Sequence, residues 1–364
     1  MSATRSIDLE DAEGLLAADR QGLLRAASSA GAQVRTVAAA AEEGELDSLR
    51  ADDRARSVIW VAGRGTAQTA GAILAATSGG AASEPLTVAG EAPAWVGPLD
   101  VLIVAGDDPG DPALVTAAAT GVRRGARVLV VAPYEGPLRD STAGRVAVLA
   151  PRLWVPDEFG FSRYLASGLA ALHTVDRRLS VDLGLLADEL DAEALRNSAA
   201  RELFTNPAKT IAARMAGRRV ALAGDCAATL ALAAHGSSVL LRLAHEVVAA
   251  TALADAVVAL RAETSDGASV DALFHDDEID GPLPGRLRVQ ALALADERTV
   301  VSARVAGLDD VDLVVAEDVP DVTEVGDAPA TPAAPTSAGP AEQQLAVLAV
   351  RLEMAAVYMR LARG

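Results

Sequence analysis

The stretch 57–80, SVIWVAGRGTAQTAGAILAATSGG, places an apolar run, a glycine turn and a small-residue helix pattern in direct succession. α/β proteins build anion sites in this order, because the amide groups and the dipole of the helix face the turn. Gly63, Arg64, Gly65 and Thr66 are therefore candidate phosphate- or sugar-binding residues. The alternative is a turn that only reverses the chain, with Thr66 as N-cap, because the segment has neither the Walker spacing nor a complete G-x-G-x-x-G.

The composition favours a globular α/β protein with two domains. The chain has 364 residues, of which 51% are hydrophobic and only 3% aromatic, which suits helices packed on parallel sheets. Its formal net charge is −18, from 50 acidic and 32 basic residues. A surface this acidic repels nucleic acid and anionic lipid, so we expect neither as a partner.

The single cysteine, Cys226, excludes an intramolecular disulfide, and the amino-terminal residues 1–16 carry charges where a signal peptide is apolar. The longest weakly polar run, 246–260, contains Asp255 and is shorter than the roughly 20 residues of a membrane span. We expect a cytoplasmic protein without a transmembrane helix.

Apolar strand patterns alternate with helical patterns in both halves of the chain, which predicts buried parallel sheets. Two helices are expected before the first strand, at 8–26 and 31–50. Strands are expected at 57–62, 86–89, 100–106, 126–132, 145–150, 218–224, 286–294 and 310–317. Helices are expected from Thr66, from Pro112, across 160–203 and through 226–260.

A domain boundary is expected before Asn206, which would cap a helix that begins at Pro207. Residues 326–342 have the Pro, Ala, Thr and Ser composition of a flexible tether, and an apolar helix follows. The expected regions are amino-terminal helices with a first domain at 1–155, a helical connection at 156–205, a second domain at 206–325, a tether at 326–342 and a docking helix at 343–364.

The second strand-to-helix turn, 104–115, carries Asp107, Asp108 and Asp111. Carboxylates at the start of a helix are good caps but repel a phosphate dianion. A metal ion could reconcile the two, but magnesium sites take one or two carboxylates rather than three adjacent ones. The four histidines show no metal-ligand spacing, so we expect no metal and no cofactor.

Taken together, these segments resemble the bifunctional phosphoglucose/phosphomannose isomerase family, which is built from two sugar isomerase (SIS) domains. The turn at 62–66 stands where the family has Gly-Met-Gly-Gly-Ser. Residues 206–209, NPAK, match the opening of the family's second domain, and 356–364, AVYMRLARG, resemble its carboxyl terminus. The resemblance implies two Rossmann-like domains with three αβα layers and parallel sheets, a carboxyl-terminal helix and a homodimer.

The resemblance also implies a function, the isomerisation of glucose or mannose 6-phosphate to fructose 6-phosphate. Arg163 in FGFSRYLASGL resembles the family arginine that would hold the enediolate, and Glu246 in RLAHEVV resembles the glutamate that would act as base. His275 in FHDDEIDG resembles the ring-opening histidine, although its interval from Glu246 is long.

The acidic turn departs from the family, whose Ser-x-Ser-Gly-Asn-Thr phosphate loop falls on 105–110. The hydroxyls are replaced and Asp107 stands among the candidate site residues. The family's lysine near the extreme carboxyl terminus has no counterpart here. Two interpretations stay open: an enzyme acting on a small sugar phosphate, or a catalytically inactive SIS protein that binds a sugar derivative or regulates a partner.

Overall fold

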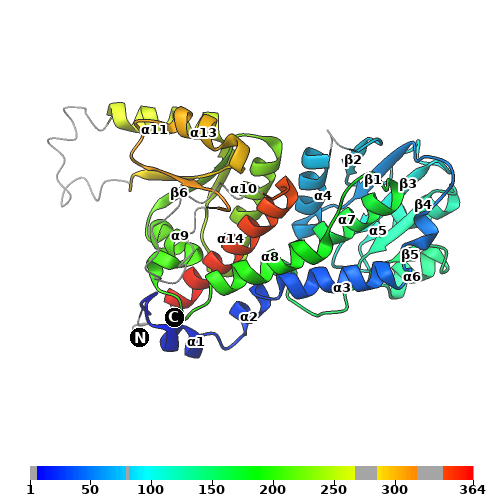
Figure 1. The fold of residues 1–364 in the computed structure, drawn as a ribbon, viewed down its shortest axis with the longest axis horizontal. Helices are drawn as coiled ribbons and strands as arrows, with labels where there is room; N and C mark the ends of the chain where they lie inside the picture. The colour runs from blue at the N-terminus through cyan, green and yellow to red at the C-terminus, as the bar shows by residue number, and fades with distance from the viewer. Residues whose placement is uncertain (1–5, 79–81, 267–284, 318–338, 364) are drawn as a thin grey trace, which may run out of the picture. The chain divides into compact units, whose positions relative to one another are not determined.

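The computed structural model describes residues 6–78, 82–266, 285–317 and 339–363. The chain divides into two compact units, residues 21–195 and residues 1–20 with 196–364. Each unit has one parallel sheet, and we call them the β1–β5 unit and the β6–β9 unit. The α/β class with two parallel sheets is thus confirmed, as is the carboxyl-terminal helix (Figure 1). Most of the expected tether lies outside the described residues.

The β1–β5 unit has sheet order β2-β1-β3-β4-β5, with all strands parallel. Its strands are β1 (Ser57–Val61), β2 (Leu86–Ala89), β3 (Asp100–Ala105), β4 (Arg127–Val131) and β5 (Ala147–Val148). Its α-helices are α2 (Leu23–Ala27), α3 (Ala30–Glu42), α4 (Gly65–Ser78), α5 (Pro112–Arg123), α6 (Gly136–Thr142), α7 (Phe161–Val175) and α8 (Leu183–Arg196). The amino-terminal pattern was predicted as two helices, which is wrong, because turns divide it into α2, α3 and the earlier helix α1 (Ala12–Ala18).

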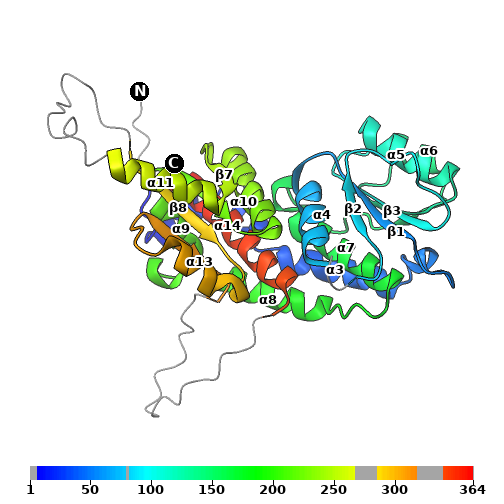
Figure 2. The same ribbon diagram turned by 90° about the horizontal axis from the view of Figure 1, so that it is seen from above.

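Helices cover both faces of this sheet (Figure 2). On one face, alternate strand residues such as Ile59 and Val104 pack with Leu114 of α5 and Leu138 of α6. On the other face, fully buried Trp60 meets α4 and α7 and donates its indole N–H to the Ala67 carbonyl at 2.9 Å. The strands are therefore apolar on both sides, as the sequence predicted.

Small residues in α4 and α7 make room for the Trp60 ring. A Cβ added to Gly71 would lie 2.3 Å from Trp60 Cδ1, and one added to Gly168 would lie 2.2 Å from a Leu74 methyl carbon. The small residues within 57–80 are thus required by the packing around Trp60.

The β6–β9 unit has sheet order β7-β6-β8-β9, again all parallel. Its strands are β6 (Arg219–Gly224), β7 (Ala249–Ala252), β8 (Leu287–Leu292) and β9 (Val311–Val314). Besides α1, its α-helices include α9 (Pro207–Met215), α10 (Ala227–Val239), α11 (Leu253–Asp266), α13 (Arg298–Val305) and α14 (Ala341–Arg363). Helices α11 and α13 pack on one face of the sheet, and α10 on the other, with α14 against α10.

The expectation of helices through 226–260 is wrong at one point. A π-helical turn, Leu240–Ala244, ends the α10 segment, and His245 then adopts a left-handed φ of 56°. The chain next forms β7, which pairs with β6 from Ala221↔Ala249 onward. A strand therefore divides the run that looked helical.

Within the described residues, one helical segment is long and apolar enough to cross a membrane by length and composition, Ala227–Ala244. The protein buries 56% of this segment, and α10 packs against β6 and α14. These contacts are those of a core helix.

A clamp of buried polar groups joins α9, α14 and the turn at 197–201. Asn206 caps α9 by accepting from the Lys209 amide, as predicted, and Pro207 is the first helical residue. The Lys209 ammonium, 1% exposed, donates to the Ala199 carbonyl at 2.9 Å and to the Arg201 carbonyl at 2.8 Å.

On the α14 side of this clamp, the Tyr358 hydroxyl donates to the Asn197 carbonyl at 2.6 Å, and burial raises the pKa of Tyr358 to about 12. The Lys209 ammonium lies 5.7 Å from the centre of the Tyr358 ring. These contacts fix the position of α14 along α9.

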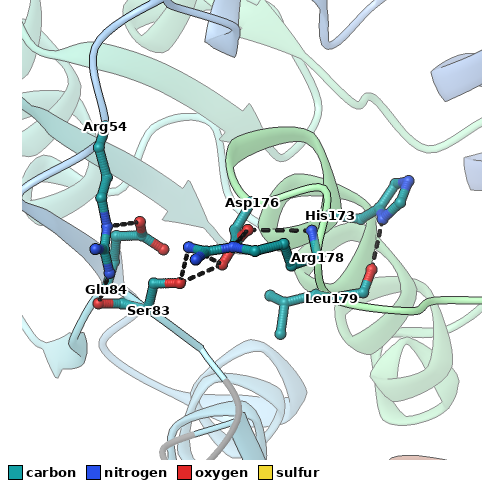
Figure 3. A network of polar contacts seen from close by, with 7 residues as sticks. All are labelled: Arg54, Ser83, Glu84, His173, Asp176, Arg178 and Leu179. Atoms are coloured by element: carbon teal, nitrogen blue, oxygen red, sulfur yellow. Dashed lines mark hydrogen bonds and ion pairs between the residues drawn. The ribbon is translucent and has the colours of Figure 1, made fainter.

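A second polar network lies at the amino ends of β1 and β2 (Figure 3). Arg178 donates to the Asp176 carboxylate through Nε at 2.9 Å, and Ser83 Oγ donates to the same group at 2.6 Å. Arg54 Nε donates to Glu84 Oε1 at 2.7 Å beside them. The hydrogen bonds that Arg178 and Ser83 donate, chiefly those from Arg178, lower the pKa of Asp176 below its usual range.

We expect Gly71→Ala to lower the free energy of unfolding by about 1–3 kcal/mol, because the new methyl group collides with Trp60. The gain in helix propensity of about 1 kcal/mol does not offset this collision. Urea unfolding measures the change. The control is Gly90→Ala, where an added Cβ meets nothing within 4 Å. Wild-type stability in Gly71→Ala contradicts the packing described.

We expect Asp176→Asn to lower the thermal midpoint at neutral pH. Because the folded-state pKa is depressed, the stabilisation is complete above the ordinary Asp value of 3.8 and is lost as the pH falls below it. The difference between the two proteins should therefore narrow from pH 4 towards about pH 2. Asp188→Asn, at an exposed ion pair, is the control. A difference in thermal midpoint that stays constant between pH 4 and about pH 2 contradicts the lowered pKa of Asp176.

Candidate functional site

The candidate site of the β1–β5 unit lies where β1 and β3 end side by side. Val61 pairs with Val104 in register, so the turns after these strands emerge next to each other. The chain leaves β1 towards β2 and leaves β3 towards β4, in opposite directions along the sheet. Such a switch point, at the carboxyl ends of parallel strands, is where doubly wound proteins bind ligands. We call residues 63–66, 106–111 and 157–164 the switch-point site.

The first turn has the geometry of an anion site, but its side chains already have partners. Gly65 takes a φ of 65°, which favours glycine, and it begins α4. Thr66 is buried in the first turn of α4, and its hydroxyl donates to the Asp157 carbonyl at 3.2 Å. The hydroxyl thus ties this turn to the segment that leads into α7.

Arg64 faces the acidic turn after β3. Its Nε lies 3.9 Å from Asp107 Oδ1, and its Nη2 lies 3.6 Å from Asp108 Oδ2. The Arg64 side chain is 62% exposed, so each ion pair is weak. The structure thus brings the predicted residues Arg64 and Asp107 together, with the carboxylates at the place where a phosphate would meet the guanidinium.

The other carboxylate of the acidic turn is structural. Asp111 is the N-cap of α5 and accepts from the Ala113 amide at 2.8 Å, as the sequence predicted. Asp108 Oδ1 also accepts from the Gly110 amide at 2.8 Å, which shapes the turn. Within the described residues, no group of three or more His, Cys, Asp or Glu side chains could hold a metal ion.

The amino end of α7 completes the site with polar atoms that have no partner. Arg163 is 8% exposed and Ser162 is 1% exposed. Among the residues that the structure describes, Arg163 Nη1 and Ser162 Oγ make no hydrogen bond, and the same holds for Gln33 Oε1. Gln33 donates from Nε2 to the Phe159 carbonyl, next to this helix end. Buried polar atoms without partners are rare and mark a place where a ligand or water binds.

Tyr164 connects the three parts of the site. The Arg163 guanidinium lies 4.1 Å from the centre of its ring. A Cβ placed on Gly160 would lie 3.4 Å from both the Tyr164 ring and Thr66 Oγ1, so these two groups flank the same glycine. Burial raises the pKa of Tyr164; the positive charge of Arg163 opposes this shift, and the negative charge of Asp107 adds to it.

The other predicted catalytic residues are not among the described residues of the β1–β5 unit. Glu246 belongs to the β6–β9 unit, in the loop between the π-helical turn and β7 rather than in a helix as expected. Its carboxylate, one-quarter exposed, is ion-paired with Arg363 of α14. His275 lies outside the described residues.

The switch point of the second sheet, between β6 and β8, is closed by its own side chains. Asp225 is ion-paired with Arg304, and Cys226 forms a capping box with Thr229 at the start of α10. A Cβ on Gly224 would lie 2.3 Å from the Leu230 amide nitrogen, so the helix sits directly on the strand end. The β1–β5 unit is therefore the better candidate for ligand binding.

Sequence reasoning missed Ser162, Tyr164 and Gln33. Ser162 and Tyr164 flank Arg163 in the quoted segment, so they could have been singled out with it. Gln33 lies 126 residues from Phe159, the residue it contacts, and no local pattern predicts that contact.

The fold defines a doubly wound α/β protein with a candidate ligand site at a switch point. No protein-family model and no curated protein matches the sequence. The structure is similar to tagatose-6-phosphate ketose/aldose isomerase from Escherichia coli, with a TM-score of 0.61 and 14% identity, covering 94% of this chain and 92% of that one. It is also similar to the C-terminal domain of glucosamine-fructose-6-phosphate aminotransferase from Francisella tularensis, with a TM-score of 0.57 and 10% identity, covering 94% and 96%.

The fold is therefore that of the SIS-domain phosphosugar isomerases. At identities this low, the similarity establishes the fold alone. The chemistry has to be argued from this chain's own residues. Membership of the phosphoglucose/phosphomannose isomerase family stays a prediction.

The binding role of Arg163 can be tested by comparing how two buried cations, Lys209 and Arg163, contribute to the free energy of unfolding. Lys209→Met leaves the Ala199 and Arg201 carbonyls without their donor, so we expect a loss of about 2–4 kcal/mol. Arg163→Met removes a guanidinium with an unpartnered nitrogen, so we expect a change within about 1 kcal/mol. Denaturant unfolding of both variants measures the contrast. A loss in Arg163→Met equal to that in Lys209→Met contradicts a binding role for Arg163.

Proposed function

We propose that this chain is an SIS-type, isomerase-like protein that interconverts the aldose and ketose forms of a hexose 6-phosphate. The observation that carries the proposal is the buried Arg163 guanidinium, which keeps a free donor at the switch point of the β1–β5 sheet. A buried cation with unused hydrogen-bonding capacity is costly unless a ligand or water binds there. A sugar phosphate as ligand is supported by the similar structure that is described as a tagatose-6-phosphate ketose/aldose isomerase.

The proposed chemistry moves one proton between C1 and C2 of the open-chain sugar. Glu246 would take the proton from one carbon and return it to the other, and Arg163 would hold the negative charge of the enediolate between the two steps. The amide groups at the start of α4, with Gly63, Gly65, Thr66 and Arg64, would hold the phosphate.

Glu246 belongs to the β6–β9 unit and Arg163 to the β1–β5 unit. Glu246 must also exchange its ion pair with Arg363 for the substrate. The resemblance adds His275 as the group that opens the sugar ring, and two chains paired as a homodimer. It adds no metal or cofactor.

A second function is favoured by specific contacts: a catalytically inactive SIS protein that binds a sugar derivative or regulates a partner. The carboxylates of Asp107 and Asp108 already meet Arg64, and Arg363 already meets Glu246. In this alternative the Arg163 donor binds a sugar hydroxyl and no proton moves.

We expect the protein to exchange the C2 hydrogen of glucose 6-phosphate or mannose 6-phosphate with deuterated water, and Glu246→Gln to abolish the exchange. The glutamine keeps the shape of the side chain but cannot accept the proton. Proton NMR follows the exchange for these sugars and for fructose 6-phosphate at C1. Arg163→Met should reduce the rate by about a hundredfold or more, because it removes a donor to the developing oxyanion.

The control for this experiment is Glu43→Gln, an exposed ion-paired carboxylate of the β1–β5 unit. Exchange that survives in Glu246→Gln contradicts its role as base. Binding of these sugars without any exchange, at high protein concentration, replaces the catalytic proposal with the inactive SIS protein.

A further inference from the structure

The contacts of Arg64 point to a specificity device within the switch-point site. Arg64 has two carboxylates at ion-pair distance, 3.9 Å and 3.6 Å, and both distances are too long for a hydrogen bond. The Asp107 and Asp108 side chains are 35% and 52% exposed. Pairs of this kind contribute about 0–1 kcal/mol each, so an incoming anion can displace them.

A phosphate dianion at the start of α4 competes directly with these two carboxylates. It gains the helix amides and Arg64, but it approaches two like charges that already share the guanidinium. At separations near 4 Å in water, each such repulsion is about 1 kcal/mol. The two carboxylates therefore oppose the binding of a phosphate, and they do not oppose a neutral hydroxyl.

A second observation, at the amino end of α7, points to a ligand. Arg163 Nη1 and Ser162 Oγ are buried without partners within the described residues, at the amino end of α7. Arg163 lies against the Tyr164 ring. Gly160 lies beside both this ring and Thr66 of the first turn. These unused groups suit the hydroxyl or carbonyl oxygens of a sugar.

We propose that Asp107 and Asp108 are built-in competitors for Arg64 that weaken the binding of phosphate at the switch-point site and leave the binding of the uncharged part of a sugar unaffected. The inference rests on the proposed function only in placing a sugar ligand at this site. A phosphate-bearing sugar binds by displacing both carboxylates from Arg64, and a neutral sugar binds without doing so.

The turn itself allows a clean test, because the charge can be removed without changing its shape. Asp108 accepts from the Gly110 amide, and an asparagine at 108 can accept the same hydrogen bond. Asp111, which caps α5, is left in place. The double variant Asp107→Asn/Asp108→Asn therefore removes two charges and keeps the backbone interactions.

A matched control exists in the same unit. Arg35 pairs with both Asp188 and Asp191 on α8, at 2.6 Å and 2.5 Å. The variant Asp188→Asn/Asp191→Asn removes the same two charges from another arginine of the unit. It corrects for the change in net charge of the protein.

Calorimetric titration with inorganic phosphate, glucose 6-phosphate and glucose compares these proteins. In Asp107→Asn/Asp108→Asn we expect the affinity for both phosphate ligands to rise about tenfold or more, or from undetectable to measurable, at low salt. The affinity for glucose should stay the same, and the gain should shrink as sodium chloride is added. Adding Arg64→Gln to the double variant should remove the gain.

Equal affinity for phosphate in wild type and variant, or an equal gain in the Asp188/Asp191 control, overturns the inference. The result is separable from the proposed function, since it needs no turnover. A gain in phosphate affinity without C2 exchange supports the inference and contradicts the isomerase. C2 exchange without a gain in phosphate affinity supports the isomerase and contradicts the inference.

Discussion

The β6–β9 unit depends on the complete burial of α14. Its side chains are buried without interruption from Gln344 to Met359. A helix surrounded in this way leaves no water for its polar groups, so each must find a partner inside the protein. Arg351 donates to the Val315 and Ala316 carbonyls that follow β9, and Glu353 meets His235 of α10 at 3.0 Å. Burial raises the pKa of Glu353, and the hydrogen bond with His235 opposes this shift.

The same requirement for buried partners explains the segments in which the sequence resembles the isomerase family. In the NPAK segment, Asn206 caps α9 and Lys209 holds two carbonyls. In the carboxyl-terminal segment, Tyr358 holds a third carbonyl. These residues join α9 to α14 and none belongs to the switch-point site. The resemblance thus follows the architecture, and the chemistry has to be argued from the turns after β1 and β3.

The sequence predicted the strongly apolar elements well, because burial on both faces leaves a direct pattern. Examples are β1, β3 and β6, the cap at Asn206 and the helix α14. It failed at β7, because residues 249–252, AATA, have little strand propensity and form a strand through pairing with β6. For the site, the turn at 63–66 and Arg163 were predicted, but the contacts of Gln33 and Tyr164 are tertiary and have no local signal.

Helix amino ends of the protein differ in how their polar groups are satisfied. The amino end of α5 is satisfied by Asp111, and in the other unit that of α10 is satisfied by Cys226 and Thr229. The amino end of α7 has no side-chain cap, and its first turn carries Ser162 and Arg163 with unpartnered buried atoms. A helix end that buries a cation and leaves its donors unused is unfavourable for folding alone. That cost is offset when a water molecule or a ligand oxygen binds to Arg163 Nη1 or Ser162 Oγ.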